Sequence, residues 1–137
     1  MIIADTGFWV ALANPRDKHH ARAREALHGI DERLITTWPV LTETCHLLLR
    51  ELGSLSQERF VAGWSGGAFE LFPMTDEHVP RILELMRTYR SLPMDLADAS
   101  LVLLAEALGH GRILSTDTRD FGAYRWKNRK PFENLLL

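Results

Sequence analysis

The sequence contains only one cysteine among its 137 residues, Cys45, so no disulfide bond can form within the chain. A lone thiol also argues against a zinc site built on cysteine ligands. Cys45 falls within the helical pattern TETCHLLL, and we interpret it as a buried structural thiol rather than a reactive one.

Long hydrophobic runs are also missing. No apolar segment approaches the length of about 20 residues that spans a bilayer. The opening segment MIIADTGFWVALAN is interrupted at Asp5 and carries no positive charge before its apolar part, so it does not match a secretory signal peptide. We therefore expect a cytoplasmic protein without a membrane segment.

An excess of one charge is absent too, since the net charge is −2. This balance argues against a broad basic face for nucleic acid, but it allows contact with phosphate through a bound cation. Hydrophobic residues at 46% and charged residues at 25% are ordinary values for a globular protein. Because the chain has no repeat, low-complexity tract or long linker, residues 1–137 are predicted to form a single domain.

Predicted strands and helices alternate along the chain. Strands are expected at 1–5, 34–37, 68–74 and 112–116, and helices at 7–13, 19–30, 39–52, 57–64 (capped by Ser56), 76–89 and 95–109. The segment after residue 116 is expected to be irregular, with a short final strand. This alternation predicts an α/β fold with a parallel sheet covered by helices on both faces. Right-handed crossovers then bring the helix starts to the edge where the strands end.

Four acidic residues fall at this predicted edge. Asp5 closes the first strand and Asp117 follows the last long one, while Glu43 lies in about the first turn of its helix. Asp98 lies in the first turn of the helix at 95–109, on a stripe shared with apolar residues. Asp95, just before it, is interpreted as the helix cap.

Repulsion between these carboxylates decides what such a cluster means. Two carboxylates about 5 Å apart repel by roughly 3 kcal/mol at an effective dielectric constant near 20. Four ionised acids at one edge therefore require raised pKa values or a divalent cation. Oxygen ligands without histidine or thiol partners favour Mg²⁺ or Mn²⁺ over zinc. We expect such a cation to explain the carboxylate of Asp5 in an apolar run.

Four segments resemble the signature motifs of the PIN-domain nucleases. They are ADTGFWVAL with Asp5, WPVLTETCHLL with Glu43, DLADASLV with Asp98 and STDTRDF with Asp117. Each motif is weak alone, but the four in this order and spacing are specific together. The resemblance spans about residues 2–121 and is closest to the single-domain, VapC-like toxins of prokaryotic toxin–antitoxin pairs.

The resemblance implies a PIN-like α/β fold and a metal-dependent endonuclease that acts on RNA. It implies that the catalytic and metal-binding residues, with Mg²⁺ or Mn²⁺ as cofactor, are Asp5, Glu43, Asp98 and Asp117. Thr6 and Ser115 match positions where the family often has a hydroxyl near the site, and Asp95 and Asp120 are further acids beside it. Gly7 departs from the family, which often has Ser or Asn there, so one polar contact is expected to be lost. The family also implies a homodimer and, for a toxin, a cognate antitoxin protein.

Basic residues near the end of the chain are candidates for RNA contacts. They are Arg119, Arg125, Lys127, Arg129 and Lys130, with Tyr124 and Trp126 as aromatic rings on which bases could stack. The alternative is a solvated tail. The basic segment at 16–24 is interpreted as a solvated helix face, with His19 and His20 structural or facing solvent. Trp38 and Trp64 are expected in the core or in a dimer contact.

The sequence also bears on other functions. A receiver domain requires paired acids after the first strand and a lysine after the last, and residues 4–6 and 115–119 contain neither. A haloacid-dehalogenase-type phosphatase requires Asp-x-Asp after the first strand, but Gly7 stands where the second aspartate is required. A catalytically silent PIN-fold module that binds RNA or protein is a remaining alternative. A DNA-directed nuclease is another, because no residue identifies the reader of a 2′-hydroxyl.

Overall fold

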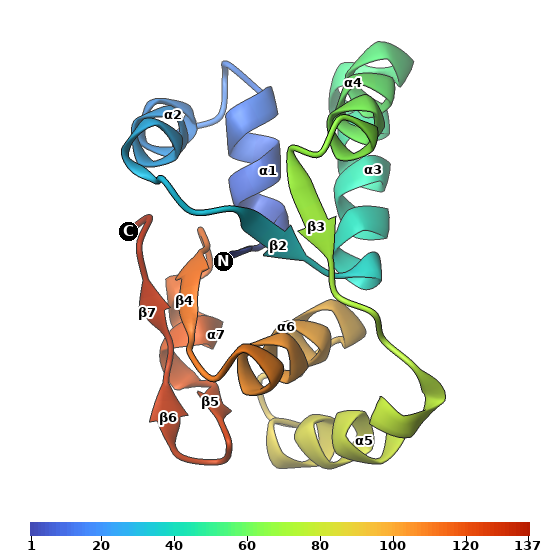
Figure 1. Ribbon diagram of the computed structural model, residues 1–137, viewed down its shortest axis with the longest axis vertical. Helices are drawn as coiled ribbons and strands as arrows, with labels where there is room; N and C mark the ends of the chain where they lie inside the picture. Colours follow the sequence, from blue (N-terminus) through green and yellow to red (C-terminus); the bar gives the residue numbers. More distant parts are fainter.

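A five-stranded parallel sheet forms the centre of the computed structural model, which describes residues 1–137 (Figure 1). The strand order is β3-β2-β1-β4-β7, and every neighbouring pair in it is parallel. The strands are β1 (Ile2–Ala4), β2 (Leu34–Thr36), β3 (Phe69–Leu71), β4 (Arg112–Leu114) and β7 (Glu133–Asn134). The parallel sheet expected from the alternating pattern is therefore confirmed.

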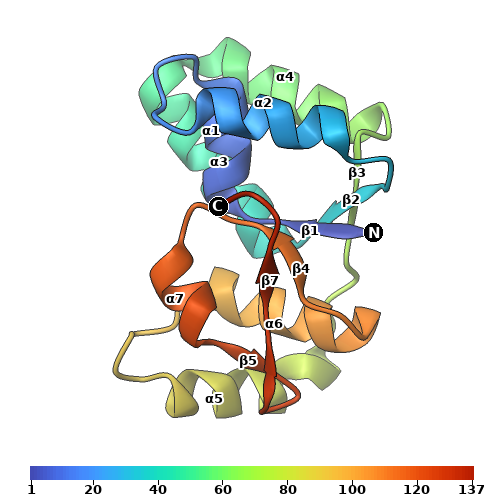
Figure 2. The same ribbon diagram turned by 90° about the vertical axis from the view of Figure 1, so that its left-hand side faces the viewer.

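Helices cover both faces of this sheet, as the sequence pattern predicts. They are α1 (Thr6–Ala13), α2 (His20–Gly29), α3 (Trp38–Leu52), α4 (Ser54–Ser65), the 3₁₀ helix η1 (Asp76–His78), α5 (Val79–Thr88), α6 (Leu96–Leu108) and α7 (Thr118–Ala123). Figure 2 shows α1 to α4 on one side of the strands and α5 and α6 on the other. α1 packs against α2 and α3, and α5 packs against α6.

The central strands are apolar because they are covered on both faces. All three residues of β1 are buried, and Ile113 and Leu114 of β4 are completely inaccessible. α6 packs beneath them, with eight of its residues buried, and ends at Gly109, whose φ of 77° is the left-handed conformation that favours glycine. This core fixes the two strand ends that carry Asp5 and Ser115.

Several boundaries differ from the sequence-based expectation. α4 begins at Ser54, directly after Gly53, so Ser56 lies inside the helix and is not its cap. Residues 117–131 are not irregular: they form α7 and an antiparallel hairpin of β5 (Arg125–Trp126) and β6 (Lys130–Pro131). The expected short final strand is present as β7. None of the helices combines the length and the apolar character needed to cross a bilayer.

Candidate functional site

Asp5 lies between β1 and α1, at the edge where the strands end. Its Oδ1 atom caps α1 by accepting a hydrogen bond from the Thr6 N–H at 2.7 Å. Its Oδ2 atom accepts a second hydrogen bond from the Ser115 hydroxyl at 2.8 Å. Only 7% of Asp5 is exposed. The carboxylate is accommodated there partly because both of its oxygens have donors.

Ser115 connects Asp5, which follows β1, with Asp117, which follows the neighbouring strand β4 and precedes α7. The Ser115 hydroxyl is completely buried, and while it donates to Asp5 it accepts a hydrogen bond from the Asp117 N–H at 3.0 Å. Asp117 caps α7, since its Oδ1 atom accepts a hydrogen bond from the Asp120 N–H at 2.9 Å. One hydroxyl therefore joins the ends of β1 and β4.

Asp98 enters the same region from the first turn of α6. Its N–H donates to Oδ1 of Asp95 at 2.8 Å, so Asp95 is the helix cap, as predicted. Its Oδ2 atom accepts a hydrogen bond from the Tyr124 hydroxyl, also at 2.8 Å. Tyr124 is completely buried, so the expectation that it could stack with RNA bases is wrong. Its actual contact is with a carboxylate that the motifs had singled out.

A cavity of about 340 Å³ brings these residues together. Its lining consists of Asp5, Thr6, Gly7, Glu43, Leu47, Pro93, Asp95, Asp98, Thr116, Asp117 and Asp120. Glu43 reaches it from the second turn of α3, one turn later than expected. Six of the lining residues are acidic, and none is a lysine or an arginine. The acids that are far apart in the sequence thus share one strongly negative cavity.

Burial raises the pKa of three of these acids, Asp5, Asp98 and Asp120. Desolvation raises the pKa of Asp5 from 3.8 to about 6, although the hydrogen bonds from Ser115 and Thr6 lower it, and the charge of Glu43 adds to the rise. Desolvation likewise raises the pKa of Asp98 from 3.8 to about 7, against the lowering effect of Tyr124. The negative charge of the ionised acids is not balanced within the lining, because no basic side chain belongs to it.

The acidic side chains do not form a ready-made metal cluster. No three His, Cys, Asp or Glu side chains are grouped closely enough to hold an ion. Asp5, Asp98 and Asp117 each accept a hydrogen bond from a donor of the protein. Two buried oxygens of lining residues, Oγ1 of Thr6 and Oδ1 of Asp120, nevertheless have no hydrogen-bond partner. Such an oxygen donor set with unbalanced charge fits a hard divalent cation of the Mg²⁺ or Mn²⁺ type.

Gly7 and Thr116 fit together on the wall of the cavity. A Cβ atom placed on Gly7 would lie 1.9 Å from Oγ1 of Thr116, so any side chain at position 7 would collide with this hydroxyl. Gly7 is expected to lack a polar contact, because many members of the family have Ser or Asn at this position. The structure shows that the hydroxyl of Thr116 takes up the space beside it.

Comparison with known proteins identifies the family. The family model named PIN domain matches residues 2–127 of the chain. The chain belongs to the PIN domain family. The prediction made from the four motifs is thereby confirmed, and the match includes Asp5, Glu43, Asp98 and Asp117.

Two relatives of this PIN domain come from Mycobacterium tuberculosis. Ribonuclease VapC26 is 25% identical over 124 residues, which cover 90% of this chain and 92% of the relative. The crystal structure of VapC20, described as a sarcin-ricin loop cleaving toxin, superposes with a TM-score of 0.80 at 22% identity, covering 87% of this chain and 92% of that one. The structural likeness supports the PIN fold found here.

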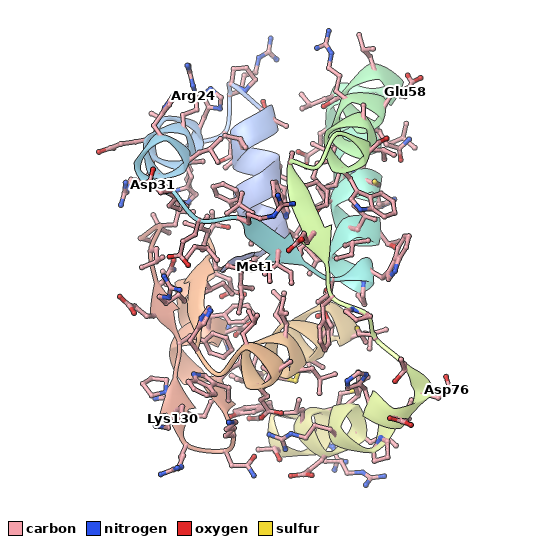
Figure 3. The ribbon with its side chains drawn as sticks, in the orientation of Figure 1. Met1, Arg24, Asp31, Glu58, Asp76 and Lys130 are labelled. Atoms are coloured by element: carbon pink, nitrogen blue, oxygen red, sulfur yellow. The ribbon has the colours of Figure 1, made fainter.

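The basic residues proposed for RNA contact occupy different places in the PIN domain. Arg119 is exposed in α7, between Asp117 and Asp120. Lys127 and Arg129 are exposed in the loop of the β5–β6 hairpin, next to Lys130 at the lower end of the molecule in Figure 3. The N–H of Lys127 donates to Glu106, which is eight residues along α6 from Asp98, or about 12 Å at the usual helical rise.

Two further aromatic residues have different surroundings. Trp126 is buried and its indole N–H donates to the Pro131 carbonyl at 3.1 Å, so its role in the hairpin is structural rather than that of a surface for bases. Trp38 is 51% exposed and its ring packs edge-on against Trp64. Of the two places expected for Trp38, the core is thereby excluded, and the dimer contact stays a prediction. The guanidinium of Arg125 is tied to the carbonyls of Gly122 and Tyr124.

Proposed function

We propose that this PIN domain is a metal-dependent endoribonuclease that hydrolyses phosphodiester bonds of RNA. The observation that carries the proposal is the cavity in which six acids meet without a basic residue, three of them with raised pKa values. The family and a relative named as a ribonuclease support RNA as the substrate. Mg²⁺ or Mn²⁺ is the proposed cofactor.

Asp5, Glu43, Asp98 and Asp117 are the proposed ligands of the cation. When bound, the cation would lower the pKa of a water molecule and neutralise charge on the scissile phosphate. The residues of the chain would prepare this site. Ser115 and the Thr6 N–H orient the Asp5 carboxylate, and Tyr124 orients that of Asp98. Asp120 and Thr6 each have a free buried oxygen to offer to the hydrated cation.

The lack of a covalent catalytic group supports hydrolysis by water. Burial raises the pKa of the Cys45 thiol, which keeps it protonated and unreactive at neutral pH. Cys45 is also not among the residues that line the acidic cavity. The attacking group in the proposed reaction is therefore water, and the protein contributes positioned carboxylates.

The biological part of the proposal is that the protein is the toxin of a toxin–antitoxin pair, active as a homodimer in the cytoplasm. Its support is the likeness to proteins named VapC. A cognate antitoxin would be encoded in a neighbouring reading frame. Expression of the PIN domain alone should arrest growth, and co-expression of the neighbour should restore it. Unimpaired growth with active, folded protein would contradict the toxin role.

A metal-dependent cleavage assay tests the enzymatic part. The protein is incubated with single-stranded RNA and Mn²⁺, with and without a chelator, and Mn²⁺ binding is measured separately by calorimetry. Asp98→Asn should abolish most cleavage and weaken Mn²⁺ binding. Asp31→Asn is the matched control, because Asp31 is exposed just before β2, at the opposite edge of the sheet from the cavity, and should behave as wild type (Figure 3).

The outcomes separate the alternatives. Cleavage that requires Mn²⁺ and fails in Asp98→Asn supports the ribonuclease. Cleavage of single-stranded DNA but not RNA would show that the substrate is DNA and would leave the metal-dependent mechanism unchanged. RNA binding without cleavage under any metal would indicate a catalytically silent module and would overturn the proposal.

A further inference from the structure

Asn134 continues the pairing of β7 with β4 by one step, using its side chain. The two strands pair in parallel with Ile113 opposite Asn134, and the Leu135 N–H donates to the Ile113 carbonyl at 2.7 Å. Beyond this point β4 ends at Leu114. The Asn134 amide then bonds to the backbone of Ser115 in both directions, donating from Nδ2 to the carbonyl at 2.9 Å and accepting at Oδ1 from the N–H at 3.3 Å.

The same amide is itself fixed. Oδ1 of Asn134 also accepts a hydrogen bond from the Leu136 N–H at 3.0 Å, and Leu136 is completely buried. A primary amide offers the donor and acceptor pair of a peptide group, which is why it can replace a missing strand residue here. The backbone of Ser115 is therefore held in place from the end of the chain.

Ser115 passes this constraint to the acidic cavity. Its hydroxyl donates to Oδ2 of Asp5 and accepts from the Asp117 N–H, so both of its polar functions are engaged. Asp5 and Asp117 are two of the four acids proposed to hold the cation. Asn134 touches neither of them, and it lies outside residues 2–127 that match the family model.

We propose that Asn134 is a positioning residue of the active site, which orients Asp5 and Asp117 through Ser115. This inference rests on the proposed function. Partners that orient metal ligands from outside typically contribute about 10- to 100-fold to metal affinity or activity. Loss of the Asn134 amide should therefore weaken Mn²⁺ binding by about 10-fold, while the KM for RNA stays unchanged and kcat falls.

A double-mutant cycle on the RNA-free protein tests the route through Ser115. The variants are Asn134→Ala, Ser115→Ala and the double mutant, and the readout is the Mn²⁺ dissociation constant from calorimetry. If Asn134 acts through Ser115, the double mutant should bind Mn²⁺ no more weakly than Ser115→Ala. Glu133→Ala is the matched control, because Glu133 is an exposed neighbour on the same strand and should leave Mn²⁺ binding unchanged.

A second variant covers the case in which Asn134→Ala unfolds β7. Asn134→Asp keeps the oxygens that accept from Ser115 and Leu136 but removes the donor to the Ser115 carbonyl, and it should weaken Mn²⁺ binding in a folded protein. Losses of Mn²⁺ affinity that multiply in the double mutant would overturn this inference and leave the proposed function standing. Folded Asn134 variants with wild-type Mn²⁺ binding would do the same. A wild-type protein that binds no Mn²⁺ would overturn the proposed function and this inference with it.

Discussion

The Tyr124 hydroxyl donates a hydrogen bond of 2.8 Å to Oδ2 of Asp98, which lies 26 residues earlier in the chain. The ring of Tyr124 is completely buried, packed edge-on against Tyr89 and Phe121. The hydrophobic core therefore holds a hydroxyl in place for one of the acids in the cavity. Core packing and the orientation of the Asp98 carboxylate are coupled by this one bond.

Tyr124→Phe should weaken the site without removing any proposed ligand. Loss of a hydrogen bond to a charged acceptor is expected to cost about 1–2 kcal/mol of unfolding free energy. The pKa of Asp98, which is already about 7, should rise further, because the Tyr124 bond lowers it. Mn²⁺ binding at pH 7 should therefore weaken, as measured by calorimetry, with stability measured by urea unfolding.

Tyr89→Phe is the control for this experiment. The Tyr89 oxygen accepts from the Arg125 N–H at 2.9 Å and makes no hydrogen bond to Asp98, so its removal should cost similar stability and leave Mn²⁺ affinity unchanged. Equal losses of Mn²⁺ affinity in both variants would mean that the Tyr124 bond has no specific role.

Asp98→Asn should make the metal-free protein more stable at alkaline pH. The pKa of Asp98 is about 7 in the folded protein and near 3.8 in the unfolded chain, so the folded state binds the proton more tightly. The stability that the protonated Asp98 carboxyl contributes is fully present below about pH 4 and is lost as the pH rises through about 7. Because Asp98 is only partly buried, the discounted gain at pH 8 is about 1–2 kcal/mol.

Urea unfolding in the presence of chelator measures this gain at several pH values. The difference between Asp98→Asn and wild type should shrink steadily from pH 8 to pH 4.5. A difference that does not depend on pH would show that the ionisation of Asp98 is not its source.

The positions of the four acids could be predicted because they depend on local pattern. Asp5 follows an apolar strand, and Asp98 shares a helix stripe with apolar residues, so both can be placed from their neighbours in the sequence. The parallel topology then brings strand ends and helix starts to one edge. The same reasoning identified Asp95 as a cap, whereas Ser115 was indicated as a neighbour of the site only by the resemblance to the PIN-domain nucleases.

The supporting residues could not be predicted because their roles arise from contacts distant in sequence. Tyr124 and Asn134 lie in a segment that looked like a solvated tail, yet they reach Asp98 and Ser115 in the folded chain. The β5–β6 hairpin could not be predicted because its loop holds Lys127 and Asn128 at positive φ. Lysine is uncommon in this conformation, so the loop sequence does not indicate a turn. A short helix such as α7 also gives little periodic signal.

Arg81→Met should destabilise the protein far from the cavity. Arg81 bonds to both oxygens of Glu106, at 3.0 and 2.7 Å, and also to Asn128 of the hairpin, which links α5, α6 and the hairpin. The Arg81 and Glu106 side chains are only 20% and 17% exposed. Urea unfolding should show a loss of about 2–3 kcal/mol, since removal of one partner leaves a half-buried charge.

Arg50→Met is the surface control for Arg81. The Arg50–Glu51 pair is well exposed, so its loss should change the unfolding free energy by no more than about 0.5 kcal/mol. RNA cleavage by either variant, measured below its melting temperature, should match the wild type. Similar destabilisation in both variants would show that burial does not determine the strength of these pairs.

Arg119→Gln should affect RNA binding more than Arg129→Gln does. Arg119 is exposed between two acids of the cavity, whereas Arg129 lies in the hairpin loop toward the other end of α6. We therefore expect a phosphate bound near the cation to contact Arg119 rather than Arg129. KM for a short single-stranded RNA should rise several-fold in Arg119→Gln, with a weaker salt dependence. A larger effect in Arg129→Gln would place the RNA path along the hairpin instead.

Gly7→Ser and Thr116→Ala should compensate each other. The Cβ of a serine at position 7 would lie 1.9 Å from Oγ1 and 3.1 Å from Cβ of Thr116, so Gly7→Ser alone must displace this residue at the cavity wall. Overpacking of this kind costs about 1–3 kcal/mol, and RNA cleavage should fall with it. Thr116→Ala removes the colliding hydroxyl and should by itself cost less than about 1 kcal/mol.

The double mutant decides whether the collision is the cause. It should recover most of the stability lost in Gly7→Ser, with a coupling energy of about 1 kcal/mol or more from urea unfolding. Cleavage should return as well if the serine hydroxyl can take the place of the one removed from Thr116. Losses that simply add would mean that position 7 requires glycine for a reason other than the space taken by Thr116.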